Sequence, residues 1–384
     1  MDYSEYKKIP IYEKLWQDSP IPILNKADIR DNFPNNWFTP AVKKAVELGD
    51  VEWVASSGTT SDRMQIMRPK NWRFLQLEKT YNQHKTLKKC WDEQLTRIAL
   101  TTAICSQTLC FKEDPGPKKR FIGRTLYINL SSDPETWERN DLERLLNEIT
   151  NHAPYFLDAD PYYLAIFLKK LKHYDLLSNL VEPQAITFSY ELTTKNIRQY
   201  IQNAFASPLI NIYGSTELGY LFMENEQGKM SLCSEQTAVE FLPLDIDNKL
   251  YHLVISCTKN PYMPLIRYRT GDCVQIDNLE NTNEIIRICG REKETLTKAN
   301  RIIPQAFVDD LIHVYAPDIL IYQLQELGQD KLQLSYTTFS DDPIASDRII
   351  ELEKQISILT DNQCKARHRK TLSPGFSGKF SWLK

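Results

Sequence analysis

The chain has 384 residues, of which 42% are hydrophobic and 25% are charged, proportions that are usual for globular proteins. This length predicts a large buried core, divided between two or three domains. The net charge of −3 and the pI near 6.1 argue against a protein dedicated to nucleic-acid binding.

Cysteine use and hydropathy predict the compartment. The eight cysteines are scattered and form no C-x-x-C pair. The first residues are polar and lack the apolar stretch of a signal peptide, and no apolar run approaches the roughly 18 residues of a membrane-spanning helix. We therefore expect reduced thiols, no membrane segment and a cytoplasmic protein.

The first candidate ligand-binding loop follows a predicted strand at 51–55, which comes after a helix ending at Gly49. The loop at 56–61 is rich in serine and threonine and contains Gly58. Its hydroxyl and backbone N–H groups can surround anionic oxygens. The sequence G-x-x-x-x-G-K-[ST] of the Walker P-loop occurs nowhere in the chain. The alternative interpretation is a plain Ser/Thr turn.

The middle of the chain alternates between strand and helix patterns. Residues 72–96 predict one helix with mixed faces. Strands are then predicted at 98–104, 127–130, 154–157 and 185–188, and helices at 133–152, 162–172 and 195–205. This order predicts a largely parallel α/β sheet that binds ligands at the carboxyl ends of its strands. The polar stretch of Ser189, Tyr190 and Glu191 follows one of these strands.

The residues from 211 to 219 contain the densest group of candidate ligand-binding side chains. Tyr213 offers a flat face for a base, and Gly214 lets the backbone approach a ligand. Ser215 and Thr216 can hydrogen-bond phosphate oxygens, and Glu217 can hold a bridging Mg²⁺. Alone, the stretch also fits a strand end followed by a polar turn with a capping serine.

After residue 230 the pattern becomes mostly β. Strands are predicted at 238–241 and 250–256, and a third leads to the turn of Gly271 and Asp272. Asp272 can accept two hydrogen bonds from a ribose diol, although a hairpin-turn aspartate is the alternative. A small α/β unit follows, with helices at 304–314 and 343–359 and strands at 319–324 and 331–337. Lys379 lies in a loop near the C-terminus.

In this order, the stretches resemble the motifs of the adenylate-forming superfamily, which comprises acyl-CoA synthetases, peptide-synthetase adenylation domains and luciferases. The matching stretches are SSGTT at 56–60, SYE at 189–191, YGSTE at 213–217, YRTGD at 268–272, GR at 290–291 and GK at 378–379. The resemblance covers the chain from about residue 50 onward. The stretch PLIRYRTGD and the short chain are most similar to the phenylacetate–CoA ligase branch.

The resemblance implies an α/β fold with two domains. Residues 1–293 would form a large N-terminal domain that has mostly parallel sheets and a β-rich part at about 230–290. Residues 294–384 would form a small, mobile α+β domain that rotates about a hinge at Glu294 after adenylation.

The resemblance also implies a reaction in two steps. A carboxylate attacks the α-phosphorus of ATP and forms acyl-AMP and pyrophosphate, and a thiol of CoA or of a carrier-protein phosphopantetheine then takes the acyl group. Two like charges about 4 Å apart repel by roughly 4 kcal/mol at an effective dielectric constant near 20. Catalysis is therefore mainly charge neutralisation and alignment of the reactants.

Each implied role falls on a residue of this sequence. Lys379 would contact the carboxylate and the α-phosphate, Glu217 would bind Mg²⁺, and Thr216 would contact phosphate, which makes these three the implied catalytic residues. The residues implied to bind ATP are Ser56, Ser57, Gly58, Thr59, Thr60, Ser189, Tyr190, Glu191, Asn211, Tyr213, Gly214, Ser215, Thr216, Asp272 and Arg291.

The chain departs from the family pattern at two motifs. The phosphate loop continues with Ser61, Asp62 and Arg63 where relatives have a glycine and Pro-Lys, so Arg63 is a candidate substitute. In the run that lines the thiol tunnel of relatives, Ala299 replaces a glycine, which implies a narrower tunnel or a different acceptor.

Two further interpretations concern cysteines. Some relatives bind structural zinc, and Cys233, His252, Cys257 and Cys273 fall in the comparable region without the paired knuckle, which favours buried free thiols. Cys364 precedes a basic run, for which we weigh self-acylation, docking of an acidic carrier protein or CoA, and a plain solvated linker.

The substrate expected from the branch is an aryl or small hydrophobic carboxylic acid. The alternatives are an amide-forming or acyl-protein ligase that uses an amine or a protein thiol, and a non-catalytic relative that acts as a binding module. An acyl or peptidyl carrier protein is a candidate partner. The sequence does not fix the oligomeric state, for which a homodimer is one option.

Overall fold

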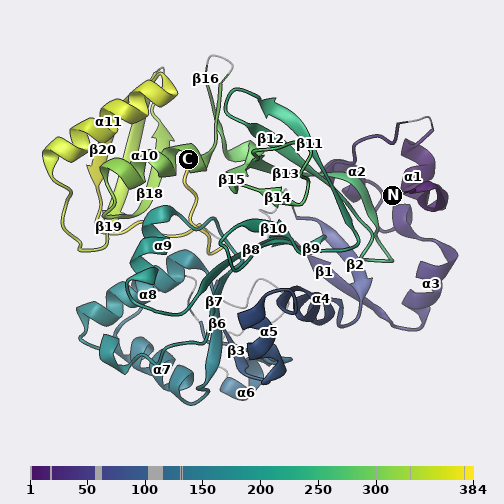
Figure 1. Cartoon of the computed structure of the whole chain (residues 1–384), viewed down its shortest axis with the longest axis horizontal. Helices are drawn as coiled ribbons and strands as arrows, with labels where there is room; N and C mark the ends of the chain where they lie inside the picture. Colours follow the sequence, from purple (N-terminus) through teal and green to yellow (C-terminus); the bar gives the residue numbers. More distant parts are fainter. Residues whose placement is uncertain are drawn as a thin grey trace. The chain divides into compact units, whose positions relative to one another are not determined.

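The computed structural model describes residues 2–17, 20–56, 63–102, 116–129, 131, 133–298, 301–328, 330–375 and 377–384. The chain forms two compact units (Figure 1). Unit 1 comprises Met1–Lys85 and Ile212–Ile288, and unit 2 comprises Thr86–Asn211 and Cys289–Lys384. The chain therefore begins in unit 1 and passes into unit 2 after Lys85. It returns to unit 1 within β8 (Leu209–Ser215) and passes back into unit 2 within β15 (Arg287–Arg291). The domain boundary near residue 293 stays a prediction.

Unit 1 begins with short helices and a hairpin. Its first segment contains η1 (Ser4–Lys8), α1 (Pro10–Leu15), α2 (Lys26–Arg30), η2 (Asn35–Trp37), α3 (Pro40–Glu47), β1 (Val51–Ala55), β2 (Gln65–Pro69) and α4 (Trp72–Tyr81). The helix α3 begins where the Thr39 hydroxyl accepts a hydrogen bond from the Val42 N–H and Pro40 takes the first helical position. The strands β1 and β2 pair antiparallel, with Ala55 opposite Gln65.

The second segment of unit 1 is almost entirely β. It contains β9 (Gly219–Glu224), β10 (Met230–Leu232), β11 (Thr237–Asp245), β12 (Leu250–Cys257), β13 (Leu265–Gln275) and β14 (Glu284–Ile285). The strands β11, β12 and β13 form an antiparallel sheet, and β9 pairs with the second half of β8. The predicted β-rich part is therefore present.

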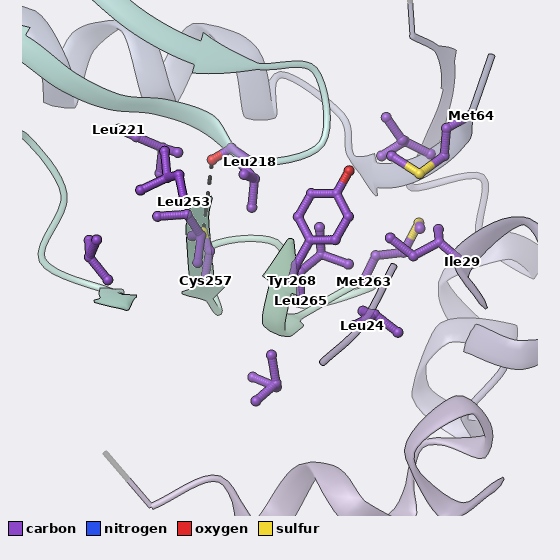
Figure 2. Packing of buried hydrophobic residues seen from close by; sticks show 14 of the residues in the cluster. Leu24, Ile29, Met64, Leu218, Leu221, Leu253, Cys257, Met263, Leu265 and Tyr268 are labelled. Atoms are coloured by element: carbon purple, nitrogen blue, oxygen red, sulfur yellow. Dashed lines mark hydrogen bonds between the residues drawn. The ribbon is translucent and has the colours of Figure 1, made fainter. Parts of the chain in front are cut away.

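The core of unit 1 joins its two segments. Figure 2 shows Leu24 and Ile29 from the first segment beside Met263, Leu265 and Tyr268 from the second, all of them buried. Their apolar surface is removed from water, which contributes about 25 cal/mol for each Å² buried. This packing fixes β13, whose far end contains the predicted ribose-binding aspartate.

Unit 2 is built on a mostly parallel sheet, as the sequence predicts. Its first segment contains α5 (Lys85–Asp92, beginning at the unit boundary), β3 (Thr96–Leu100), α6 (Pro117–Arg120), β4 (Phe121–Ile122), β5 (Thr125–Tyr127), η4 (Pro134–Thr136), α7 (Arg139–Thr150), β6 (Tyr155–Ala159), α8 (Pro161–His173), η5 (Leu177–Asn179), β7 (Ile186–Phe188) and α9 (Lys195–Gln202). The strands β5-β3-β6-β7-β8 pair parallel in this order, and β4 pairs antiparallel with β5. The helices α7, α8 and α9 gather on one side of β6 and β7 (Figure 1).

The C-terminal segment of unit 2 has a core of its own. It contains η6 (Glu292–Glu294), β16 (Leu296–Lys298), β17 (Arg301–Ile303), α10 (Gln305–Tyr315), β18 (Ile319–Glu326), β19 (Lys331–Thr338), α11 (Ser346–Thr360) and β20 (Gln363–His368). Leu320 and Ile321 of β18 also pack into the core formed by α8, α9 and the parallel sheet. The Lys169 ammonium of α8 donates a hydrogen bond of 3.0 Å to the Thr338 carbonyl, and the Tyr200 and Phe339 rings stack at 4.1 Å.

Three element predictions are wrong in detail. The helix expected over 72–96 is two helices, α4 and α5, because polar groups in the break bond elsewhere: Gln83 donates to the Cys233 carbonyl. The helix expected over 133–152 begins only at Arg139, after the separate turn η4. The basic run after Cys364 is not a linker but the strand β20, which pairs parallel to β19.

Among the residues that the structure describes, no helix is both long enough and apolar enough to cross a membrane.

Candidate functional site

In unit 1, the turn between β8 and β9 is linked to the end of β13 by two tyrosine hydrogen bonds. The Tyr213 hydroxyl donates to Asp272 Oδ2 at 2.6 Å, and the Tyr268 hydroxyl donates to Glu217 Oε1 at 2.9 Å. Burial, together with the neighbouring carboxylates, raises the pKa of both tyrosines well above the usual value. Both hydroxyls therefore stay protonated, as donors to these carboxylates.

The backbone of the β8–β9 turn is tightly packed. A Cβ atom on Gly214 would lie 2.3 Å from the Gly219 carbonyl oxygen and 2.8 Å from the Tyr220 Cα. The Ser215 hydroxyl accepts a hydrogen bond from the Leu218 N–H at 3.3 Å, as in the turn-capping interpretation. The fold itself thus requires glycine at 214, in addition to the ligand approach that the sequence suggested. Thr216 lies half-buried in the same turn.

The chemistry of Glu217 suits a magnesium ligand. It is 7% exposed, and one of its two oxygens accepts the bond from Tyr268. No cluster of three or more acidic, histidine or cysteine side chains suited to a metal occurs within the described ranges. A single carboxylate fits Mg²⁺, because this ion commonly binds one or two carboxylates and completes its shell with substrate phosphates and water.

Asp272 stands at a turn that the local sequence shapes. Gly271 has a φ of +81°, a conformation that glycine adopts without strain, and the Asp272 N–H donates to the Thr270 hydroxyl at 3.1 Å. The register of β12 and β13 shifts between His252 and Val254, next to this turn.

Ser56 closes the base of the predicted phosphate loop. Its N–H donates to the Met64 carbonyl at 2.8 Å, and its hydroxyl accepts from the Met64 N–H at 2.9 Å. The other predicted residues of this loop, Ser57, Gly58, Thr59 and Thr60, lie outside the described residues, as do Ser61 and Asp62.

In unit 2, the loop after β7 is fixed by Asp158, a residue that the sequence interpretation missed. The Ser189 hydroxyl donates to Asp158 Oδ1 at 3.2 Å, and the Tyr190 hydroxyl donates to Asp158 Oδ2 at 2.6 Å. Asp158 is buried and also forms an ion pair with the buried Arg97. The only signal in the sequence was a second aspartate at the end of a strand, two residues before Asp160.

The residues around Lys379 dock on this loop. The Lys379 ammonium donates to the Tyr190 carbonyl at 2.9 Å, and the Phe380 N–H donates to Glu191 at 3.2 Å. The Tyr163 hydroxyl donates to the Gly378 carbonyl at 2.9 Å. The structure therefore brings Lys379 together with the predicted stretch 189–191.

Asp160 is the second residue missed at this place, since the sequence indicated only a helix cap. Its Oδ1 does cap α8, accepting from the N–H groups of Tyr162 and Tyr163 at 3.0 and 3.4 Å. Its Oδ2 is buried without a hydrogen-bond partner. Burial raises the pKa of Asp160 to about 6, although the Lys379 ammonium acts in the opposite direction.

The remaining predicted residues lie in unit 2. The Asn211 side chain accepts a hydrogen bond of 2.8 Å from the Thr193 hydroxyl, where the chain passes into unit 1. Arg291 ends β15 and precedes η6, the short turn that contains Glu294. Hinge motion at Glu294 and nucleotide contact by Arg291 and Asn211 stay predictions.

The four cysteine and histidine positions considered for zinc lie in unit 1. Cys233, Cys257 and Cys273 are buried, and the Cys257 thiol donates to the Leu218 carbonyl at 3.8 Å (Figure 2). His252 contacts the guanidinium of Arg269.

Comparison with known proteins finds similarity in sequence to one curated protein and in fold to several solved structures. No family model matches the chain. Among curated proteins, the chain is 25% identical to Protein CapK of Staphylococcus aureus over 227 residues, which span 56% of this chain and 49% of that protein. The match thus covers about half the length of the curated relative.

Several of the solved structures that match this chain are CoA ligases. A 2-hydroxyisobutyryl-CoA ligase bound to 2-HIB-AMP has a TM-score of 0.69 and 13% identity, over 99% of this chain and 86% of that one. The benzoate CoA ligase of Burkholderia xenovorans LB400 has a TM-score of 0.58 and 13% identity, over 86% and 67% of the two chains. The anthranilate CoA ligase AuaEII, bound to anthranoyl-AMP, has a TM-score of 0.57 and 13% identity, over 86% and 66%. The predicted fold class is confirmed, and the chain has the fold of the adenylate-forming CoA ligases.

Proposed function

We propose that this chain is an acid–thiol ligase, which activates a carboxylic acid with ATP as acyl-AMP and then transfers the acyl group to a thiol. The observation that carries the proposal is the hydrogen bond between Tyr213 and Asp272, 59 residues apart in the sequence. It joins a motif whose tyrosine suits base binding to a motif whose aspartate suits ribose binding. The fold that the chain shares with CoA ligases supports the same conclusion.

The side chains of unit 1 suit the nucleotide. One oxygen of Asp272 accepts a hydrogen bond from the Tyr213 hydroxyl, and this bond would hold the carboxylate in place to accept hydrogen bonds from a ribose diol. The Tyr268 hydroxyl fixes Glu217 in the same way, so that this carboxylate would hold Mg²⁺ against phosphate oxygens. Bound Mg²⁺ would supply positive charge that offsets the repulsion between the acid and ATP.

The Lys379 ammonium would supply the second positive charge. In this structure it donates to the Tyr190 carbonyl, a hydrogen bond that a substrate oxygen can replace. An ammonium group stabilises the negative charge that develops on the α-phosphate during attack. It also attracts the attacking carboxylate and aligns it with the α-phosphorus. Thr216, in the β8–β9 turn, would donate its hydroxyl to a phosphate oxygen.

An aryl or small hydrophobic acid is the proposed substrate, with CoA or a carrier-protein phosphopantetheine as the acceptor. The acids named in the structural neighbours are of this size: 2-hydroxyisobutyrate, benzoate and anthranilate. Transfer to Cys364 of the same chain is disfavoured, because this thiol is buried within β20 and its burial raises the pKa to about 12.

The test is release of pyrophosphate from ATP·Mg²⁺ across a library of carboxylic acids, each with and without CoA. We expect release with a narrow set of acids, and faster turnover with the correct thiol. Carrier proteins and amines take the place of CoA in parallel reactions, which identifies the acceptor. If no acid in the library gave pyrophosphate release and calorimetry detected no binding of ATP·Mg²⁺, the proposal would be contradicted and a non-catalytic binding module would be favoured.

Glu217→Gln supplies the matched variant for this assay. Glutamine keeps an oxygen that can accept from Tyr268 but removes the charge that holds Mg²⁺. We expect the Mg²⁺ concentration needed for half-maximal release to rise at least about tenfold, because carboxylates are preferred Mg²⁺ ligands. Glu235→Gln, at an exposed position of the same unit, is the control and should leave this concentration unchanged.

A further inference from the structure

Two carboxyl groups, those of Asp160 and Glu191, lie beneath the C-terminal loop that contains Lys379. We infer that this carboxyl pair shares one proton and positions residues 377–380, here called the tail loop, so that Lys379 is held at the reaction site. The inference rests on the function proposed above, in which Lys379 contacts the reactants.

The first observation is the unpartnered oxygen of Asp160. The residue is 0% exposed, and its Oδ1 is occupied by the N–H groups at the start of α8. Its Oδ2 is buried and receives no hydrogen bond from any donor in the described part of the chain. A buried carboxylate oxygen without a donor is costly, so a proton donor is expected beside it.

The second observation is that Glu191 lies within hydrogen-bond reach of Asp160. Two carboxylates cannot donate to each other, whereas a protonated Glu191 would give Asp160 Oδ2 the donor that it lacks. Burial and the nearby Asp160 charge both raise the pKa of Glu191 well above its ordinary value, in agreement with this assignment. Such a pair titrates as a unit.

The tail loop is the element that the pair holds. The Phe380 N–H donates to both oxygens of Glu191, at 3.3 and 3.2 Å. Gly378 fits closely, because its φ is +77° and a Cβ atom would lie 2.9 Å from the Thr102 side chain. The Phe380 ring lies 5.3 Å from that of Tyr162, which follows the Asp160 cap.

The surrounding charges favour one proton on the pair. Lys379, on the tail loop, supplies a positive charge beside both carboxyls. The α8 residues Tyr162 and Tyr163 face the pair as neutral groups, since burial raises the pKa of both. The charge of Asp309 in α10 also raises the pKa of Tyr162, and the charge of Asp133 near η4 also raises the pKa of Tyr163.

These charges set the pH dependence of the tail loop. With one proton, the pair has one negative charge to balance Lys379 and keeps an acceptor for Phe380. With no proton, two negative charges repel each other and Asp160 loses its donor. Docking of the tail loop should therefore weaken when the pH rises above the pKa of Glu191.

The test is hydrogen exchange of the tail-loop amides in the full-length protein without substrates, corrected for the intrinsic pH dependence of exchange. In the wild type, we expect protection of the tail loop to fall as the pH rises. Glu191→Gln should remain protected at every pH, because its amide donates to Asp160 and its carbonyl accepts from Phe380. Glu191→Ala, which lacks both groups, should lose protection by about tenfold or more, the scale of one lost hydrogen bond.

An identical pH dependence in the wild type and Glu191→Gln would overturn the inference, and so would full protection in Glu191→Ala. A spectroscopic measurement covers the case in which Glu191→Ala does not fold. The infrared spectrum of the wild type at neutral pH should contain a protonated-carboxylic-acid band that is missing from Glu191→Gln, and absence of the band from the wild type would overturn the inference.

These measurements use no substrate, so they decide the inference even if the proposed reaction fails. Where a substrate acid is found, the alkaline fall in pyrophosphate release should be present in the wild type and missing from Glu191→Gln. A shared alkaline fall would count against the pair as positioning residues, while leaving the adenylation reaction itself supported.

Discussion

At the scale of single residues, Lys379 is the strongest candidate for a direct catalytic role. Its ammonium lies at the end of a well-fitted loop and is hydrogen-bonded to a backbone carbonyl. Lys379→Ala should slow pyrophosphate release by about 10²–10³, the range for losing one preorganised donor. The control is Lys384→Ala, at an exposed position five residues on, which should leave the rate unchanged. An unchanged rate in Lys379→Ala would remove this lysine from the site.

The ionisation of Glu191 should also make the free energy of unfolding depend on pH. Its pKa is raised in the folded protein above the ordinary value of 4.5, so the folded state binds more protons between these two values. The stabilisation is complete below the unfolded-state pKa and is lost as the pH rises through the folded-state pKa. The free energy of unfolding of the wild type should thus fall relative to Glu191→Gln, by at most about 1.4 kcal/mol for each pH unit.

Urea unfolding of both proteins, from about pH 5 to about pH 9, measures this difference. The titrating groups other than Asp160 and Glu191 are common to both proteins, so the subtraction isolates the titration of this carboxyl pair. Parallel curves over the whole range would contradict the raised pKa.

At the scale of elements, the β8–β9 turn depends on its glycine. Gly214→Ala places a methyl group 2.3 Å from the Gly219 carbonyl oxygen, and backbone cannot yield as a flexible side chain does. Overpacking of this kind costs about 1–3 kcal/mol in the free energy of unfolding, measured by urea denaturation. Gly116→Ala is the control, since a Cβ atom there meets nothing within 4 Å. Equal stability of the two variants would show that the turn adapts.

The end of β6 depends on the ion pair between Asp158 and Arg97. Asp158→Asn leaves the buried arginine without its countercharge, which typically costs about 3–5 kcal/mol. Asp318→Asn removes a partner of Arg348 from an exposed pair and should cost less than about 1 kcal/mol. Thermal unfolding of the two variants compares these costs, and a small loss in Asp158→Asn would mean that water enters the site.

At the scale of the whole molecule, local patterns predicted most elements, but contacts between distant residues were not readable from them. The strand at 186–188 and the helix at 195–202 follow from apolar periodicity and a capping threonine, which are local. The break after Tyr81 depends on partners about 150 residues away, and no local signal shows it. The strand β20 was missed because its exposed lysine and arginine side chains conceal the buried Cys364.

Some residues of the candidate site were also predicted from the sequence, and others were not. The stretch 189–191 follows a strand of the parallel sheet, as the sequence pattern predicts, whereas Ser56 follows β1, which pairs antiparallel with β2 in a separate sheet. The two aspartates that organise the loop after β7 were not assigned, since an aspartate at a strand end is usually a cap or a turn. Only the three-dimensional structure shows that Asp158 is bonded to Arg97 and that Asp160 lies beside Glu191 and Lys379.

Unit 2 is assembled from two segments that the ribosome makes far apart in time. Residues 86–211 are complete long before Leu320 and Ile321, which fill the core beneath α8 and α9. Until those residues emerge, the nascent chain exposes an apolar helical surface, which is the kind of surface that chaperones bind. Termination of translation before residue 321 would therefore leave this helical surface exposed, because the two residues that cover it would never be made.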